Sequence, residues 1–160
     1  MGADVAVGED EPAGGVEPQG TVEVRGTALH GTVIAGALTV RCIDELPVLA
    51  VLATQAEGVT EVRDAAELRA KESDRIAGVA AGLHALGAHC EETPDGMVIE
   101  GPSRLHAASL DAHGDHRLAM AWAVAALLVA DGERTTEIAG AECAAVSYPG
   151  FFEALRSAVA

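Results

Sequence analysis

The chain has 160 residues, of which 49% are hydrophobic and only 2% aromatic, so it suits one domain whose core is built from Ala, Val, Leu and Ile. Its 25 acidic and 10 basic residues give a formal net charge of -15, which argues against nucleic acid or an anionic membrane as a partner. An anionic ligand would therefore have to be bound by local basic residues, against the overall field.

The cysteines and the apolar segments argue against other classes of protein. Cys42, Cys90 and Cys143 are odd in number, far apart and without a CxxC pair, so we expect neither a zinc site nor a disulfide framework. The apolar run at residues 118–130 is shorter than the ~20 residues that span a bilayer. With no signal peptide at the start, the sequence predicts a soluble, cytoplasmic protein without a membrane partner.

The beginning of the chain predicts a β-hairpin and then a helix. Residues 1–7 and 21–25 alternate apolar and polar side chains, and the Gly-, Pro- and Glu-rich segment between them is typical of a long hairpin loop. Asp44 is predicted to be the N-cap of an apolar helix at residues 48–56, with Pro47 in its first turn.

A second helix is predicted at residues 71–86, and the charged sequence KESDR at residues 71–75 stands at its start. Apolar residues follow with the spacing of a buried helix face, and Gly87 is expected to terminate the helix. Glu72 stands four residues before the first of them, so we expect its carboxylate to extend the buried stripe. The stripe consists of Ile76, Val79, Ala80, Leu83 and Leu86.

The charged groups of this segment can converge over one helical turn, because Arg75 lies three residues after Glu72 and four after Lys71. Lys71 is also the only lysine of the chain, which suggests a position that needs a compact ammonium with a tunable pKa. The alternative is an ordinary charged first turn with a Glu/Arg pair.

The remaining elements are predicted from alternation, turn residues and helical spacing. They are a strand at residues 60–64, a hairpin at residues 89–92 and 97–100 around Pro94-Asp95-Gly96, strands at residues 109–112 and 135–138, and helices at residues 118–130 and 149–158.

The two halves of the chain match one another, which indicates an internal repeat. In each half a hairpin follows an apolar-Gly-Ala sequence, a Leu-His pair precedes a strand, and an Asp precedes an apolar helix. The matching positions are residues 1–3 and 86–88, 29–30 and 105–106, 44 and 115, 57–58 and 131–132, and 60–62 and 136–138. We expect a βαβαββ unit used about twice. No helix precedes the first hairpin, so the chain is expected to begin in the middle of a unit, as a fragment of a longer protein.

Three predicted helix starts carry charge, at residues 44–45, 71–75 and 115–117. Helix N-termini present free N–H groups that suit phosphate and carboxylate ligands, and the repeat should bring these starts to one rim. Arginines at these starts can grip oxyanions, while carboxylates supply acid/base capacity. The arginines are Arg75 and Arg117, and the carboxylates are Asp44 and Glu72.

Each of these positions also has a structural explanation. Asp44 and Asp115 can be simple N-caps, His116 a helix-start histidine with its hydrogen bonds satisfied, and Arg117 a partner of the cap. The set as a whole favours a site that handles anions.

Five motifs resemble the C-terminal part of the 5-enolpyruvylshikimate-3-phosphate synthase family, and they occur in the order found in that family. They are IDELP at residues 43–47, RDAAELR at 63–69, KESDR at 71–75, DHRLAM at 115–120 and SYPGFF at 147–152.

The resemblance implies an α/β (α+β) fold, an inside-out α/β barrel built of repeated βαβαββ units, with three units in each of two domains and the site in the cleft between them. Residues 1–160 would be the C-terminal enolpyruvyl transferase domain with about two units present, and the N-terminal domain would be absent. The implied reaction transfers the enolpyruvyl group of phosphoenolpyruvate to the 5-hydroxyl of shikimate 3-phosphate and releases phosphate. It implies no metal and no organic cofactor.

The resemblance also implies roles for individual residues. Asp44 matches the carboxylate that takes the 5-hydroxyl proton and contacts shikimate 3-phosphate, and Lys71 matches a lysine that binds the same substrate. Glu72 matches the carboxylate implicated in protonating the methylene carbon of phosphoenolpyruvate. Arg75 and Arg117 match arginines that bind phosphoenolpyruvate, with His116 nearby.

Two departures from the family pattern limit these expectations. Val146 stands where many members carry a lysine, which implies a weaker clamp on phosphoenolpyruvate, and the N-terminal domain would have to supply half of the cleft. One alternative is a non-catalytic binding or assembly module that retains the fold. Another is a UDP-N-acetylglucosamine enolpyruvyl transferase, against which the motifs at residues 71–75 and 115–117 argue.

Overall fold

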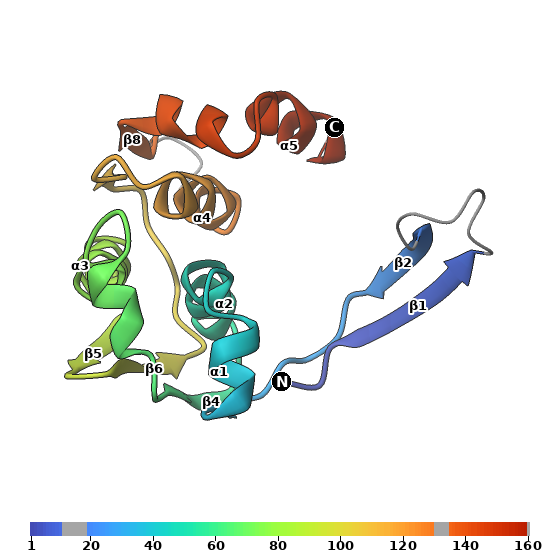
Figure 1. Ribbon diagram of the computed structural model, residues 1–160, viewed down its shortest axis with the longest axis horizontal. Helices are drawn as coiled ribbons and strands as arrows, with labels where there is room; N and C mark the ends of the chain where they lie inside the picture. The colour runs from blue at the N-terminus through green and yellow to red at the C-terminus, as the bar shows by residue number, and fades with distance from the viewer. Residues whose placement is uncertain (11–18, 130–134, 160) are drawn as a thin grey trace.

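The structure is a computed structural model that describes residues 1–10, 19–129 and 135–159. It contains helices and strands in a mixed α/β arrangement, as predicted (Figure 1). In chain order the elements are β1 (Asp4–Asp10), β2 (Gln19–Arg25), β3 (Val33–Ile34), α1 (Ala37–Arg41), α2 (Leu46–Ala53), β4 (Gly58–Val62), the 3₁₀ helix η1 (Ala66–Ala70), α3 (Arg75–Ala85), β5 (His89–Thr93), β6 (Gly96–Gly101), β7 (Ser109–Asp111), α4 (His116–Ala126), β8 (Glu137–Ala139), the 3₁₀ helix η2 (Ala141–Val146) and α5 (Phe151–Val159).

The main body is layered on a four-stranded sheet of order β3-β4-β6-β5. Strand β3 is parallel to β4, and the β5–β6 hairpin adds to β4 in the antiparallel sense. Helices α2 and α3 lie over this sheet, α4 lies beyond them, and η2 and α5 follow at the far end (Figure 1). The predicted hairpin around Pro94-Asp95-Gly96 is therefore confirmed and forms one side of the sheet.

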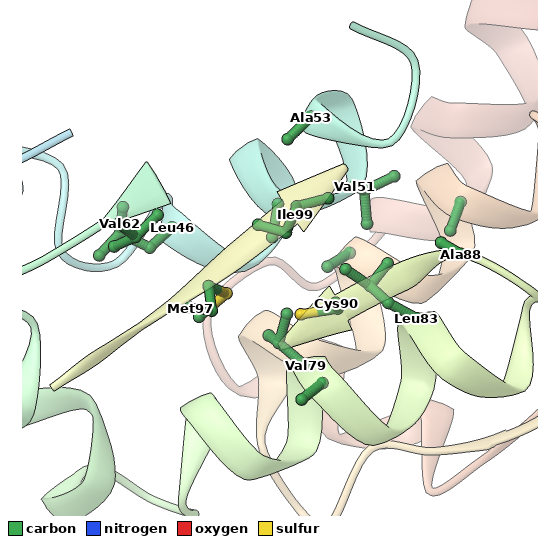
Figure 2. Packing of buried hydrophobic residues seen from close by; sticks show 14 of the residues in the cluster. Leu46, Val51, Ala53, Val62, Val79, Leu83, Ala88, Cys90, Met97 and Ile99 are labelled. Carbon is green, nitrogen blue, oxygen red and sulfur yellow. The ribbon is translucent and has the colours of Figure 1, made fainter. Parts of the chain in front are cut away.

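The apolar stripe of α3 packs on the β5–β6 hairpin as its spacing predicts, and all five stripe residues are buried. Figure 2 shows Val79 and Leu83 beside Cys90, Met97 and Ile99 of the hairpin. Burial of large aliphatic side chains of this kind contributes about 1.5–3 kcal/mol each. Gly87 follows the helix with a φ of 88°, a left-handed conformation that glycine adopts at low cost, so it ends α3 as expected.

A close approach of α3 to α4 explains the glycine in the middle of α3. A side chain at Gly82 would collide with the ring of Trp122, which is completely buried and donates its Nε1–H to the Asp111 carbonyl oxygen at 3.1 Å. Gly82 thus permits the packing of the two helices whose first turns bear the charged site.

Two parts of the chain repeat the same geometry. Strand β7 is parallel to β8, as β3 is to β4, and in both halves a Leu-His pair precedes the first strand of the pair. The His30 N–H donates to the Met1 carbonyl oxygen at 3.0 Å, and the His106 N–H donates to the Leu86 carbonyl oxygen at 3.0 Å. The matches that the sequence predicts between these positions therefore have equivalent backbone contacts.

The first hairpin, β1–β2, is confirmed as an antiparallel pair, and it projects away from the main body (Figure 1). Its predicted loop lies largely outside the described residues. At the other end of the chain, α5 begins two residues later than the predicted closing helix at 149–158 and ends one residue beyond it. Strand β8 likewise begins two residues later than the predicted strand at 135–138 and ends one residue beyond it.

Two predictions about helix starts are wrong. Helix α2 begins at Leu46 with Glu45 in the N-cap position and no side-chain cap bond, so Asp44 is not its N-cap. Helix α3 begins at Arg75, because the Asp74 side chain accepts a hydrogen bond from the Ala77 N–H at 3.0 Å and fixes the start there. Glu72 therefore precedes the helix and is exposed instead of extending the buried stripe.

Helices α1, η1 and η2 were not predicted, because each has only five or six residues and gives little periodicity. The apolar helix predicted at residues 118–130 starts two residues earlier, at His116, and ends at Ala126. No helix in the described part of the chain is both long and apolar enough to cross a membrane.

Candidate functional site

The site is built on a buried arginine at the first position of α3. The Arg75 side chain is 1% exposed, its Nε donates to Asp115 Oδ2 at 2.7 Å, and its Nη2 reaches Asp115 Oδ1 at 3.3 Å. Asp115 is also completely buried, and it accepts hydrogen bonds from the Arg117 N–H at 2.9 Å and the Ser73 hydroxyl at 3.2 Å. Buried charges are tolerated when they are paired and hydrogen-bonded in this way. We call Ser73, Arg75 and Asp115 the anchor.

The anchor holds two carboxylates that face solvent. Arg75 Nη1 donates to Asp44 Oδ1 at 2.7 Å, and Arg75 Nη2 donates to Glu72 Oε2 at 2.7 Å. The side chains of Asp44 and Glu72 are 40% and 48% exposed. One guanidinium therefore orients three carboxylates, of which two remain accessible.

Two cations flank Asp44 without being bound tightly to it. Lys71 Nζ lies 3.9 Å from Asp44 Oδ1 and 2.8 Å from Glu67 Oε1, while Arg117 Nη2 lies 3.9 Å from Asp44 Oδ2. Arg117 Nη1 also lies 3.3 Å from Glu45 Oε1. A separation of 3.9 Å exceeds hydrogen-bond length, so both cations can turn to an anionic ligand without breaking a short bond to Asp44. We call Asp44, Lys71, Glu72 and Arg117 the rim.

Arg117 also has a hydrogen-bond donor that lacks an acceptor in the described part of the chain. Its Nε is buried and has no hydrogen-bond partner among the described residues. A buried donor without an acceptor costs about 1–3 kcal/mol, which an oxyanion reaching this nitrogen would recover.

The electrostatics keep the aspartates of the site ionised. Desolvation alone would raise the pKa of Asp115, but the hydrogen bond from Arg75 and that from the Arg117 N–H outweigh it and hold the pKa below its usual value. Desolvation likewise opposes the shift at Asp44, whose pKa is lowered by the hydrogen bond from Arg75 and by the charges of Lys71 and Arg117. The hydrogen bond to Glu67 raises the pKa of Lys71. At neutral pH the rim thus presents an ionised Asp44 between two cations.

The segment before α3 is fixed by a second arginine. Arg69 donates to Asp74 Oδ2 at 2.9 Å and to Glu92 Oε1 at 2.8 Å, and its Nε donates to the Pro94 carbonyl oxygen at 2.9 Å. These contacts tie the helix cap to the β5–β6 hairpin. Residues 71–73 are thereby presented between η1 and α3.

Five of the six residues that the sequence singles out lie in one network of contacts. They are Asp44, Lys71, Glu72, Arg75 and Arg117. The sixth, His116, is the first residue of α4 and is half-buried, and its side chain makes no hydrogen bond or ion pair with the described residues.

The sequence does not indicate the further residues whose contacts hold the network in place. Ser73 bonds to Asp115 across 42 positions of sequence, and Asp115 appears from its sequence context as an ordinary helix cap. Glu67 could have been found as the residue four before Lys71. Glu45 binds Arg117 across 72 positions, a contact that no local pattern indicates.

Fold and site together define a mixed α/β protein with a cluster of charged side chains at the starts of two helices. The sequence pattern of the family described as EPSP synthase (3-phosphoshikimate 1-carboxyvinyltransferase) matches residues 1–155. The chain belongs to this family.

Relatives at high identity carry the same name. A 3-phosphoshikimate 1-carboxyvinyltransferase of Roseiflexus castenholzii is 58% identical over 130 residues, which are 81% of this chain and 30% of the relative. One of a Roseiflexus species is 62% identical over 127 residues, 79% of this chain and 29% of the relative. The chain thus spans about a third of the length of the curated relatives it matches.

A solved structure agrees with these relatives. The EPSP synthase of Acinetobacter baumannii superposes with a TM-score of 0.84 at 37% sequence identity, over 98% of this chain and 36% of that protein. The likeness in structure covers α5 and the β1–β2 hairpin as well as the main body.

Proposed function

We propose that this chain supplies one half of the active site of a 3-phosphoshikimate 1-carboxyvinyltransferase. The reaction transfers the enolpyruvyl group of phosphoenolpyruvate to the 5-hydroxyl of shikimate 3-phosphate, with release of phosphate. The observation that carries the proposal is the convergence of Asp44, Lys71, Glu72 and Arg117 around the buried Arg75. Each of these residues belongs to a motif that resembles the family's.

The cations of the rim are proposed to hold the two substrates. Both substrates are anions and repel one another, so cations must bring them together before reaction. In our proposal Lys71 leaves Glu67 and binds shikimate 3-phosphate, while Arg117 leaves Glu45 and binds phosphoenolpyruvate with its fork of N–H groups. The partners that they leave are exposed carboxylates, so the exchange leaves no buried charge unpaired.

The carboxylates of the rim are proposed to move the protons. Asp44, ionised and flanked by Lys71 and Arg117, accepts the proton of the 5-hydroxyl as that oxygen attacks. Glu72 delivers a proton to the methylene carbon of phosphoenolpyruvate as the 5-hydroxyl oxygen bonds to the adjacent carbon. The bond from that carbon to the phosphate oxygen then breaks, the new methyl group returns a proton to Glu72, and the carbon–carbon double bond of the enolpyruvyl group is restored. No step in this scheme calls on a metal or an organic cofactor.

Arg75 is proposed to act first by positioning these carboxylates. The sequence predicts that it binds phosphoenolpyruvate, but its guanidinium already donates to Asp44, Glu72 and Asp115. A direct contact with phosphoenolpyruvate therefore requires Asp44 or Glu72 to release one N–H. We assign His116 no role beyond proximity to Arg117.

We further propose that the chain comprises about two βαβαββ units of an inside-out α/β barrel, as part of the C-terminal domain of a longer cytoplasmic enzyme. The equivalent parallel pairs β3–β4 and β7–β8 support the repeat. The relatives' additional length supports a second half of the cleft. Val146, where many members carry a lysine, is 79% exposed, and in this proposal the clamp on phosphoenolpyruvate is correspondingly weaker on that side.

The proposal is tested by measuring phosphate release from the two substrates. We expect no measurable turnover by the 160-residue chain alone, and some turnover when the N-terminal part of a relative is added or fused. Robust phosphate release by the purified chain alone would overturn the half-site proposal. Failure of every fused, folded protein to turn over would favour a module that binds without catalysis.

A further inference from the structure

Each cation of the rim is paired in this structure with a glutamate that lies outside the rim. Lys71 Nζ lies 2.8 Å from Glu67 Oε1, and Arg117 Nη1 lies 3.3 Å from Glu45 Oε1. Both cations stay 3.9 Å from the nearer oxygen of Asp44. The shortest ion pair of each cation is therefore made with a glutamate, and we call Glu45 and Glu67 the competing glutamates.

The competing glutamates can leave these contacts without harm to the fold. The side chain of Glu67 is 71% exposed and that of Glu45 is 52% exposed. In the described part of the chain, each side chain makes its ion pair with this one cation. An exposed carboxylate that lets go of its cation is hydrated again by water, so its release leaves no buried charge. The competing glutamates differ in this from Asp115, which is completely buried.

The competing glutamates also hold the N–H groups that an anionic ligand needs. A glutamate carboxylate and the carboxylate or phosphate group of a ligand accept charge-assisted hydrogen bonds from the same donors. Ligand and glutamate therefore exclude one another at a given N–H. Because the glutamate belongs to the chain, it competes at an effective concentration that the fold fixes and that dilution does not lower. The apparent affinity for the ligand is reduced accordingly.

The two pairs differ in how firmly they are held. Glu67 stands four residues before Lys71 and contacts it at 2.8 Å, and this hydrogen bond raises the pKa of Lys71. Glu45 contacts Arg117 at 3.3 Å, slightly beyond the usual length of an N–H···O bond. Arg117 Nε, moreover, lacks an acceptor among the described residues. An anion should therefore displace Glu45 more easily than Glu67.

We propose that each competing glutamate sets the affinity of the site for one substrate. Glu67 competes with shikimate 3-phosphate for Lys71. Glu45 competes with phosphoenolpyruvate for Arg117. The names of the substrates rest on the proposed function, whereas the competition itself requires only an anion. In the empty site the glutamates neutralise both cations, and when a ligand leaves they pair with the cations again, which favours release of the phosphate product.

The energetics of exposed ion pairs give the size of the effect. Breaking one such pair changes an equilibrium constant by up to about fivefold, and removing a negative charge beside a bound anion strengthens binding further. Replacing Glu67 by an uncharged residue should therefore tighten anion binding at Lys71 by about three- to tenfold. The looser contact of Glu45 should give about twofold at Arg117. Loss of a merely structural side chain would act in the opposite direction, because a loosened site binds more weakly.

The first test follows the binding of inorganic phosphate to the full chain. Lys71 is the only lysine, so a chain labelled with ¹³C at lysine gives one side-chain NMR signal, and its shift reports binding at this cation. At constant ionic strength, Glu67→Gln and Glu67→Ala should both bind phosphate about three- to tenfold more tightly than the unaltered chain. Glu61→Gln removes the same charge from an ion pair with Arg63 outside the rim, and it should bind phosphate as the unaltered chain does.

Three results of this titration would overturn the proposal. One is equal affinity in the unaltered chain and in both Glu67 variants. Another is tighter binding by Glu67→Gln alone, which would make the new amide a direct ligand of phosphate. The third is a Lys71 signal that does not respond to phosphate in any variant.

The second test separates the two substrates, in an enzyme completed by the N-terminal part of a relative. Glu67→Gln should lower the KM for shikimate 3-phosphate and leave the KM for phosphoenolpyruvate unchanged. Glu45→Gln should lower the KM for phosphoenolpyruvate and leave the KM for shikimate 3-phosphate unchanged. KM values that rise, or that fall for both substrates in each variant, would overturn the proposal.

Failure of this inference can be told apart from failure of the proposed function. An enzyme that turns over with unchanged KM values in Glu67→Gln and Glu45→Gln overturns the competition and leaves the proposed function standing. A completed, folded enzyme that never turns over removes the proposed function. In that case, tighter phosphate binding by both Glu67 variants of the chain would still support competition at Lys71.

Discussion

The anchor and the rim are made of the same types of side chain but stand in opposite surroundings. Arg75 and Asp115 are 1% and 0% exposed and hold one another at 2.7 Å, whereas the side chains of Arg117 and Asp44 are 32% and 40% exposed and lie 3.9 Å apart. Burial commits the first pair to the fold, because separating the two would leave a buried charge without its counter-charge. Exposure leaves the second pair free to exchange its partners for a ligand. The same types of side chain thus stabilise the fold in the anchor and, in our proposal, bind ligand in the rim.

The largest effect is expected from breaking the anchor. Arg75→Ala would leave Asp115 as an unpaired, completely buried carboxylate, which should lower the free energy of unfolding by about 3–5 kcal/mol. Urea unfolding followed by circular dichroism measures this loss. Arg63→Ala, which removes an exposed arginine paired with Glu61, is the matched control and should unfold close to the unaltered chain. Equal curves for the two variants would mean that the buried pair does not stabilise the fold.

A smaller effect, and one on function, is expected from altering the rim. In an enzyme completed by the N-terminal part of a relative, Arg117→Ala should raise the KM for phosphoenolpyruvate by about tenfold, because the proposed role of Arg117 is ionic grip. Its unfolding curve should shift far less than that of Arg75→Ala. Arg104→Ala removes the same charge from an exposed loop and should leave the kinetics unchanged. An unchanged KM in Arg117→Ala would remove Arg117 from the binding site.

The smallest effect is a change in how stability depends on pH. The pKa of Asp115 is lowered in the folded chain, so its stabilising contribution is fully present above the ordinary aspartate pKa of about 4 and is lost as pH falls through the lower folded value. Desolvation opposes this shift, and the hydrogen bond from Arg75 produces it. Asp115→Asn should be less stable at neutral pH, but its melting temperature should fall less steeply below about pH 4. If the melting temperatures of Asp115→Asn and of the unaltered chain fell equally steeply below about pH 4, this linkage would be contradicted.

Local patterns predicted much of the fold, and five of the six residues that the sequence singles out as site candidates lie in one network of contacts. The stripe from Ile76 to Leu86 follows helical spacing, and its burial was predicted because one amphipathic helix face must pack on a core. Both hairpins were predicted because alternation and turn residues act over a few positions. The parallel pairs of strands agree with the repeat that the matching halves indicate.

The failures concern contacts that only the tertiary fold creates. Glu72 was expected to be buried because it continues the apolar spacing, but Asp74 caps α3 and leaves Glu72 outside the helix. Asp44 was expected to cap a helix, yet it accepts a hydrogen bond from Arg75, which lies 31 positions away. The burial of Asp115 likewise depends on α3 and α4 meeting. No local pattern carries that information.

Steady-state phosphate release by Glu72→Gln, in an enzyme completed by the N-terminal part of a relative, tests the central claim most directly. The substitution keeps an oxygen that can accept from Arg75 but removes proton transfer, so kcat should fall by roughly 10²-fold or more, with little change in the KM for phosphoenolpyruvate. Its unfolding curve should stay close to that of the unaltered protein. A raised KM with an intact kcat would contradict the account and make Glu72 a structural partner of Arg75.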